Sequence, residues 1–368
     1  MSHTLFVLLL LLSFNRTNAQ KVWDDSNAMD SLKRGLHCIY NFEFDQALNI
    51  ELSINKKYPA EPALYMYKSL YLYWKHYPVL AGTEIGDQYE NLLMEAISES
   101  KEQLILYPEN HMVILFDMLP RMMLLQFYAD NGQGFKSIPY LSRLYESLVK
   151  GFTYCKSTPE FYFPTGLYNY YIEAYPEANP FYKPFVIFFP SGNKDLGLSQ
   201  LYQCWKLSDL IGIEAMTFLT YIQINFETNY QAGVRFAREL SEGYPNNPLF
   251  ALYYEQLLLL SKQYSKAEEL SAQFREQHNN SAFFSNIFDV YDGIIAEKYF
   301  CNYNLAQEKY KSAIPALEPF QSFGNRYRAY ANFGLSRIAK RKGETDDAKD
   351  YRTAALKLAQ YPQVNFDQ

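Results

Sequence analysis

The sequence predicts an all-α protein built as an α-solenoid, in which antiparallel helix pairs stack side by side. The main observation is a recurring turn in which an aromatic residue stands three positions before a small one. From Gly233 onward the small residues recur at Ala267, Ala306 and Ala348, in steps of 34, 39 and 42. Steps of this size are typical of helix–turn–helix repeats that stack into a solenoid. The sequence also has no alternating strand pattern longer than a few residues.

Each part of the repeated turn has a physical reason. A small residue lets two helices touch without a side chain between them, and the aromatic residue packs into the pair. Gly35 and Ser336 stand twelve positions before small residues, and we expect close helix contacts there. Since proline cannot continue a helix, a Tyr-Pro dipeptide after the second helix turns the chain into the next unit. These dipeptides lie at 58–59, 107–108, 244–245 and 361–362.

Residues 21–156 are predicted to form the N-terminal helical repeats. Apolar side chains follow helical spacing over 32–40, and the first aromatic–small turn is Phe44–Ala47. A tyrosine-rich helix is expected at 62–77. Longer helices are expected at 87–107, 110–129 and 134–156.

Residues 157–200 interrupt the pattern and are predicted to form an irregular central segment rich in proline and aromatic residues. Within it the stretch 161–198 has prolines at 164, 176, 180, 184 and 190. Its glycine turn at 192–195 precedes a further helix. Such a turn can hold an anion with help from Lys194. The alternative is that Asp195 simply caps the helix.

Residues 201–368 are predicted to form the C-terminal repeats, with turns at Tyr230–Gly233, Tyr264–Ala267 and Tyr303–Ala306. From Arg326 to Lys357 there are nine basic residues and four acidic ones, a net charge of +5. This charge could meet an acidic partner or make a peripheral contact with an anionic membrane. The alternative is a solvated cap, because a terminal repeat needs a polar outer face.

Residues 1–20 have the layout of a secretory signal peptide. Leu5–Leu12 is an unbroken apolar run, shorter than the about 20 residues that span a bilayer. Ala19 then supplies a small residue near a cleavage point, and no cysteine stands there to form a lipobox. A buried N-terminal helix is the alternative. We therefore expect an exported protein of the periplasm or cell envelope.

The turns, the 34-residue step and the prolines that end the units resemble tetratricopeptide repeats, most closely over 230–360 and also at 30–60. The central sequence adds a narrower likeness, carried by Gly166-Leu-Tyr-Asn-Tyr-Tyr, Tyr175-Pro176 and the turn from Gly192 to Leu198. It is similar to a segment of tetratricopeptide proteins of Bacteroidetes-like bacterial envelopes and of the eukaryotic inclusion-body-clearance family. The resemblance implies an α-solenoid with a scaffold or adaptor role and no known reaction.

No catalytic, metal or cofactor site is predicted. The histidines form no H-E-x-x-H pair, and the sequence has neither a G-x-S-x-G elbow nor a Walker A loop. Nucleic-acid binding does not fit an exported chain with a net charge of −6. The four cysteines are widely spaced, which argues against zinc and C-x-x-C redox chemistry and leaves buried thiols or two disulfides open. They are Cys38, Cys155, Cys204 and Cys301.

The candidate binding residues are aromatic side chains of two expected helices, because the chain is unusually rich in tyrosine, with 34 residues. Such rings could line a concave groove and hold a peptide or a glycan, and core packing between helices is the alternative. The candidates, with Lys194, are Tyr67, Tyr71, Trp74, Tyr168, Tyr171 and Tyr175.

The function expected from these observations is a non-enzymatic scaffold that binds a peptide or protein partner in a concave helical groove. The alternative is a glycan-binding component of an outer-membrane uptake or assembly system. An enzyme whose site is assembled from distant residues is a third, weaker hypothesis.

Replacing Ala267 with Glu tests the repeat alignment. We expect A267E to disrupt folding, because it forces a charge between two closely packed helices. The measurement is thermal unfolding followed by circular dichroism, and an unchanged melting temperature would show that this unit is misaligned.

Overall fold

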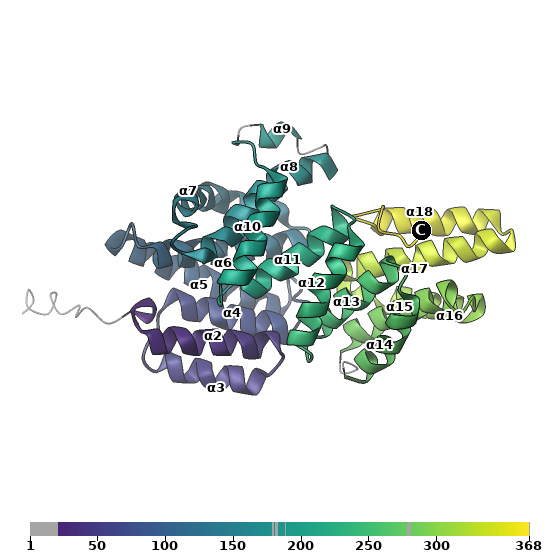
Figure 1. Ribbon diagram of the computed structural model, residues 1–368, viewed down its shortest axis with the longest axis horizontal. Coiled ribbons are helices and arrows are strands. Elements are labelled where there is room, and N and C mark those ends of the chain that lie inside the picture. The colour runs from purple at the N-terminus through teal and green to yellow at the C-terminus, as the bar shows by residue number, and fades with distance from the viewer. Residues whose placement is uncertain (1–20, 179, 181–182, 188, 278–280, 368) are drawn as a thin grey trace, which may run out of the picture.

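The computed structural model describes residues 21–178, 180, 183–187, 189–277 and 281–367, and within these ranges every regular element is a helix. The predicted signal peptide, residues 1–20, lies outside the described residues. Figure 1 shows the N-terminal helices α2 to α7 grouped on one side of the molecule and α14 to α18 on the other, with α11 to α13 between them. This arrangement is the predicted all-α solenoid.

Consecutive helices pack against each other along the whole stack. The N-terminal helices are α2 (Ser26–Tyr40), α3 (Phe44–Asn55), α4 (Pro62–Lys75), α5 (Glu84–Leu106), α6 (His111–Asp130) and α7 (Ile138–Tyr154). The central ones are α8 (Tyr162–Ala178), the short α9 (Lys183–Val186), α10 (Lys194–Leu207) and α11 (Gly212–Asn225). The C-terminal ones are α12 (Tyr230–Gly243), α13 (Pro248–Leu260), α14 (Tyr264–Gln277), α15 (Ala282–Lys298), α16 (Tyr303–Ala316), α17 (Gln321–Lys342) and α18 (Thr345–Leu358).

The helices of the C-terminal half alternate between an inner and an outer layer. The inner helices α11, α13, α15 and α17 bury side chains on most sides, whereas the outer helices α12, α14, α16 and α18 bury a single stripe. Sequence explains the difference, because α13 reads PLFALYYEQLLLL with no polar face, and a helix that is apolar all round belongs in the core. The inner helices therefore build a continuous inner face.

The small residues of the repeat pattern mark close contacts, as predicted. A Cβ atom on Gly35 would collide with the Tyr67 ring, and the Tyr67 hydroxyl donates to the Ala47 carbonyl at 2.8 Å. In the last unit the Ser336 hydroxyl donates to the Ala348 carbonyl at 2.6 Å. The Ser336–Ala348 spacing is thus a direct contact between α17 and α18. Gly35 of α2 and Ala47 of α3 are instead joined through the Tyr67 ring of α4.

The prediction of an irregular central segment is wrong for most of its length. Helices α8 and α10 pack closely against each other, and the non-helical part is confined to the connection between them. Pro164 is tolerated because it lies in the first turn of α8, where backbone N–H groups have no intrahelical partner. Pro176 lies inside the last turn, where it removes one intrahelical hydrogen bond shortly before the helix ends. Gly166 and Gly197 let the two backbones approach, since a Cβ atom on either would crowd the opposite helix.

The solenoid curls until its early units touch later ones. The Asn247 side-chain amide donates to the carbonyl of Tyr40 at 2.8 Å, joining the end of α2 to the start of α13. The Trp74 ring packs edge-on against Phe250 with centroids 5.6 Å apart. The Ser322 hydroxyl also donates to the carbonyl of Asp130, which brings α17 to the end of α6. These contacts bring the N-terminal helices against the helices that form the inner face.

Helix α6 is the one described helix that is long and apolar enough to cross a membrane. Most of it is buried, and its Arg121 and Asp117 side chains form an ion pair at 2.7 Å inside the fold. The cysteines are free thiols, of which Cys38, Cys155 and Cys204 are buried and Cys301 is exposed. The buried thiols match the core alternative considered for them.

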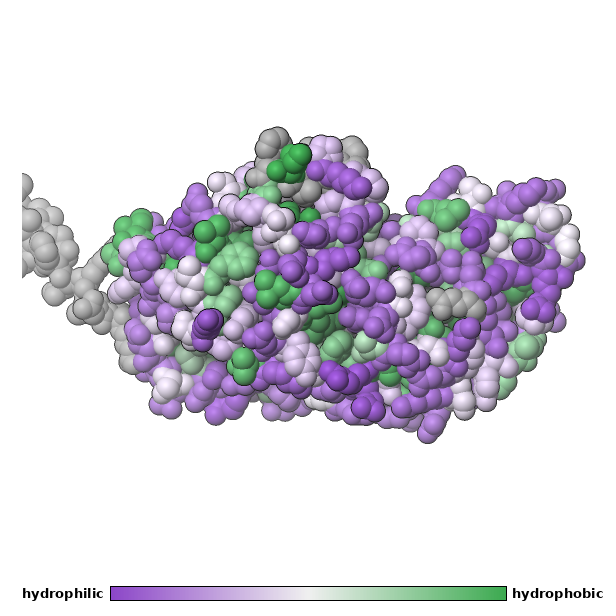
Figure 2. Space-filling view, turned by 45° about the horizontal axis from the view of Figure 1, so that its top comes forward, coloured by the Kyte–Doolittle hydropathy of each residue, from purple (hydrophilic) through white to green (hydrophobic). Residues whose placement is uncertain are grey.

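Exposed apolar side chains concentrate around α7 and the α8–α10 connection. Phe135, Ile138 and Ile187 are among the most exposed of the large hydrophobic residues. Figure 2 shows hydrophobic atoms gathered on that part of the surface, whereas the end that carries α17 and α18 is mostly hydrophilic.

The Tyr310 ring offers a sharp test of helix packing. It lies between Gly293 and Gly334, and a Cβ atom at either glycine would overlap it. We expect Gly334→Ala to lower the free energy of unfolding by about 1–3 kcal/mol, measured by urea denaturation. Gly243→Ala is the matched control, because nothing lies within 4 Å of its added Cβ atom, and it should leave stability unchanged or slightly raised. Equal stability of both variants would contradict this packing.

Candidate functional site

Tyrosine side chains from α4, α8, α11, α13 and α17, and from the residues just after α4, lie near one another on the inner face. The Tyr77 ring stacks on Phe284 and meets the edge of Phe323, each with centroids 5.8 Å away. Burial raises the pKa of Tyr77, and the nearby Tyr253 and Tyr327 hydroxyls raise it further. We call this set the inner-face tyrosines: Tyr73, Tyr77, Tyr171, Tyr221, Tyr253 and Tyr327.

One cation, Arg326 of α17, lies among these rings. Its guanidinium is 5.2 Å from the centroid of the Tyr221 ring, a cation–π contact. Burial by itself would lower the pKa of Arg326, but the surrounding tyrosine hydroxyls outweigh it and the pKa is raised. Among the described residues no carboxylate forms an ion pair with Arg326. A fork of charged donors is therefore held in aromatic surroundings, and its charge opposes the rise that burial causes in the pKa of the Asp130 carboxyl.

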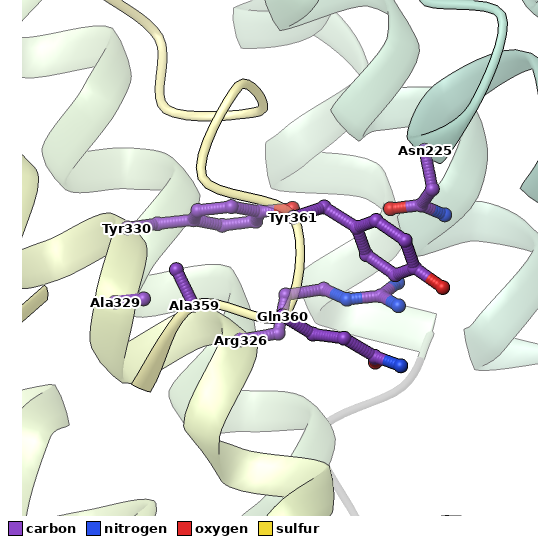
Figure 3. A pocket seen from close by; sticks show the side chains of 7 residues that line it. All are labelled: Asn225, Arg326, Ala329, Tyr330, Ala359, Gln360 and Tyr361. Atoms are coloured by element: carbon purple, nitrogen blue, oxygen red, sulfur yellow. The ribbon is translucent and has the colours of Figure 1, made fainter. Parts of the chain in front are cut away.

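A small cavity of about 10 Å³, room for about one water molecule, lies beside Arg326. Asn225 is 1% exposed, and its Oδ1 atom has no hydrogen-bond partner among the described residues, although its Nδ2 donates to the Tyr221 carbonyl at 2.9 Å. Figure 3 shows Arg326 extending between Tyr361 and Gln360, with the Asn225 amide facing them. The lining residues are Asn225, Arg326, Ala329, Tyr330, Ala359, Gln360 and Tyr361.

Two carboxylates adjoin the inner face. Asp130 accepts a hydrogen bond from the Gln126 side chain at 2.6 Å, and Glu214 accepts one from the Tyr40 hydroxyl at 2.8 Å. Burial raises the pKa of Asp130 to about 6, against the opposing effects of the Gln126 hydrogen bond and the Arg326 charge. Burial also raises the pKa of Glu214, which the Tyr40 hydrogen bond opposes.

The segment that follows α18 covers part of this surface. Tyr361, Val364 and Phe366 are all buried, and the Tyr221 hydroxyl donates to the Tyr361 hydroxyl at 3.0 Å. The inner face is thus already in contact with a non-helical stretch of the chain.

The three candidate binding residues of α4, which are Tyr67, Tyr71 and Trp74, differ in how deeply they are buried. Tyr67 and Trp74 are core residues, Tyr67 against Gly35 and Trp74 against Phe250. Tyr71 is half-buried and accepts a hydrogen bond from Lys75 at 2.9 Å. Tyr67 and Trp74 therefore pack in the core between helices, which was the alternative to lining a binding groove.

The second cluster lies closer to the inner face. Tyr171 packs edge-on against Phe226 with ring centroids 5.4 Å apart. The half-buried Tyr175 is near enough to Tyr361 to raise the pKa of the Tyr361 hydroxyl. The Tyr168 hydroxyl instead donates to the carbonyl of Pro190 at 2.7 Å, in the α8–α10 connection.

Lys194 has a structural partner. Its ammonium forms an ion pair with Glu177 at 2.8 Å. The suggestion that Asp195 caps α10 is wrong, because the side chain of Asn193 accepts from the Leu196 amide at 2.8 Å and Asp195 lies within the first turn.

Arg326, Asn225 and Tyr221 were missed by sequence reasoning. Arg326 was visible only as the first member of the basic C-terminal run, and Asn225 as an ordinary residue near a helix end. No local pattern signals either residue, because the pocket forms only when α11, α17 and the segment after α18 come together.

The inner face can offer aromatic stacking, charged donors and amide hydrogen bonds. No group of three or more His, Cys, Asp or Glu side chains that could hold a metal ion occurs within the ranges the structure describes.

Asp130 predicts a pH dependence of stability. Its folded pKa of about 6 exceeds the unfolded value near 3.9, so the native state holds the proton more tightly and stability falls as pH rises between these values. We expect Asp130→Asn to raise the free energy of unfolding by roughly 1–2 kcal/mol at pH 7.5 and to change it little at pH 4. Urea denaturation at both pH values measures this. The exposed Asp350→Asn is the control, and a similar effect of both variants at pH 7.5 would contradict the assignment.

Comparison with known proteins does not place the chain in a family. No family model matches it, and no curated protein matches it in sequence. Its function is therefore argued from the inner face.

Proposed function

We propose that this protein is a non-enzymatic scaffold that binds an extended segment of a partner protein on its inner face. The observation that carries the proposal is Arg326, a cation without an ion-pair partner among the described residues, surrounded by tyrosines from several repeats. We further propose that the repeats are of the tetratricopeptide type and that the protein acts in the periplasm or cell envelope, on the basis of the sequence patterns at 230–360 and 1–20.

The chemistry of the inner face suits a peptide. Tyrosine provides a large, stiff contact area with a polar tip, so it can pack against side chains and hydrogen-bond a backbone. The planar guanidinium of Arg326 suits a carboxylate or a carbonyl group, because it offers several donors in a fixed geometry. The helices that carry these groups are rigid, which lowers the entropic cost of binding.

Glycan binding is the second candidate, and one observation favours it. The free acceptor of Asn225 and the free donors of Arg326 face the same pocket, and a sugar hydroxyl both donates and accepts. However, sites for small molecules usually occupy about 300–1,000 Å³, whereas this cavity has about 10 Å³. A sugar ring therefore does not fit that space as it stands.

The basic C-terminal run gives weaker support to a membrane contact. Several of its side chains are engaged within the fold: Arg328 pairs with Glu318 at 3.3 Å and Arg337 with Glu297 at 2.6 Å. Fewer charges are then left to face an anionic surface, which favours a solvated cap on the last repeat.

Site-specific photo-crosslinking tests the proposed function. The photoreactive residue p-benzoylphenylalanine would replace Tyr171 on the inner face or, as a matched control, the exposed Tyr299 at the end of α15. In cells that produce the protein, we expect irradiation to give a discrete, protease-sensitive adduct from the Tyr171 position alone. Arg326→Gln should reduce the adduct about 10- to 150-fold, since a hydrogen bond to a charged group contributes about 1.5–3 kcal/mol.

Two other outcomes would contradict the proposal. Adducts of equal yield from both positions would show that the inner face does not select a partner. Saturable quenching of tryptophan fluorescence by envelope glycans, together with no protein adduct, would replace the peptide proposal with glycan binding.

A further inference from the structure

The segment Ala359–Asp367 packs on the inner face through its side chains and contains a turn from Tyr361 to Val364. It begins where α18 ends, and it has no helix or strand of its own. Tyr361, Val364 and Phe366, spaced three and two residues apart, are 7%, 1% and 5% exposed. From Gln360 onward, the Val364 amide makes the one backbone–backbone hydrogen bond recorded in this part of the described chain, to the Tyr361 carbonyl. Side chains therefore hold the segment in place.

Three side chains of the segment make specific contacts with the inner helices. The Tyr361 ring lies 5.3 Å from Phe226 between centroids. The Gln363 side chain donates to the backbone carbonyl of Asn225 at 2.8 Å, which ties the segment to the end of α11. The Phe366 ring meets the Tyr330 ring of α17 edge-on with centroids 5.0 Å apart.

An arginine recognises the acidic end of the segment. Arg337 Nη1 donates to the carbonyl of Asn365 at 2.8 Å and to the carboxylate of Asp367 at 3.0 Å. Its Nε and Nη2 atoms donate to the two carboxylate oxygens of Glu297 at 2.6 and 2.8 Å. Glu297 thus fixes the guanidinium in an orientation that presents the remaining donor to the segment. Arg352 Nη1 adds a longer hydrogen bond to Asp367 at 3.3 Å.

The segment is an incomplete occupant of its seat. Ala359, Gln360 and Tyr361 line the pocket, yet the Asn225 Oδ1 atom stays without a donor and Arg326 without an ion-pair partner among the described residues. A buried acceptor without a partner is costly, so a ligand that supplies both missing groups gains over the segment. An acidic side chain at the position of Gln360 would reach Arg326 from the rim of the same pocket.

We propose that Ala359–Asp367 occupies in cis a peptide-binding site whose ligand in trans is an extended segment of similar chemistry. That ligand has an aromatic residue, an aliphatic residue three positions later, an aromatic residue after two more and then an acidic residue. A carboxylate just before the first aromatic residue binds Arg326. The partner displaces the cis segment. This inference rests on the proposed function and names the class of peptide that the inner face binds.

The cis linkage sets the expected affinities. A tethered segment competes at an effective concentration in the millimolar range. A free peptide with the same sequence should therefore bind the native chain at least about 100-fold more weakly than a chain whose own segment has been released.

Fluorescence anisotropy with a labelled peptide tests the proposal on the full-length chain. The probe is a fluorescein-labelled, amidated synthetic peptide with the sequence of residues 358–367. The released variant is V364D/F366D, which places charges at two buried anchors of the segment. We expect saturable binding to the released variant and at least about 100-fold weaker binding to the native chain. A control peptide carrying the same two Asp substitutions should not bind.

A second peptide tests the pocket. The probe with Gln360→Glu should bind the released variant about tenfold more tightly than the unmodified probe, because its carboxylate meets Arg326. Adding Arg326→Gln to the released variant should abolish this gain without abolishing binding of the unmodified probe. A gain that survives Arg326→Gln would contradict the assignment of the pocket.

Circular dichroism establishes that the released variant keeps its helices and a cooperative melting transition. Should it unfold, the milder Phe366→Ala variant, which removes the Tyr330 contact, takes its place and should bind the probe with intermediate affinity. The proposal is overturned when a folded released variant fails to bind the probe, or when the native chain binds it equally well. If the Tyr171 position still crosslinks a partner protein in that case, the inference alone fails and the scaffold function stands.

Discussion

Helix α13 is apolar on every side, and all 13 of its residues are buried. A single neighbouring repeat cannot cover such a helix, so the chain must surround it. The outer layer covers one side through α12 and α14, and the N-terminal units cover another through Trp74 against Phe250 and Tyr40 against Asn247. Burial of α13 therefore requires the solenoid to curl, and the concave inner face follows from that curl.

The same burial places unusual polar groups in the interior. Glu255 of α13 is fully buried, burial raises its pKa, and neither carboxylate oxygen has a hydrogen-bond partner among the described residues. Next to it, Gln256 donates to the Tyr330 hydroxyl at 2.9 Å and so connects α13 to the helix that carries Arg326. The core and the inner face are thus parts of one packed unit, and a change in either is felt in the other.

The inner face combines a rigid surface with a movable occupant. Helices α11 and α17 present their tyrosines and arginines in fixed positions, whereas Ala359–Asp367 is held almost entirely by side chains. Under the proposed function, a partner that displaces Ala359–Asp367 would replace side-chain contacts and leave the helix pairs in place.

The sequence by itself determined the helical class, the antiparallel pairs and the close contacts at Gly35 and Ser336, because local periodicity and small residues directly set how neighbouring helices pack. It misjudged the central segment, since prolines in the first and last turns of α8 are compatible with a helix. The tertiary structure decided which tyrosines are core and which line the inner face, and it alone brought Asn225, Arg326 and Tyr361 together. Those three residues belong to α11, α17 and the segment after α18, and their proximity depends on how far the solenoid curls, which no local pattern encodes.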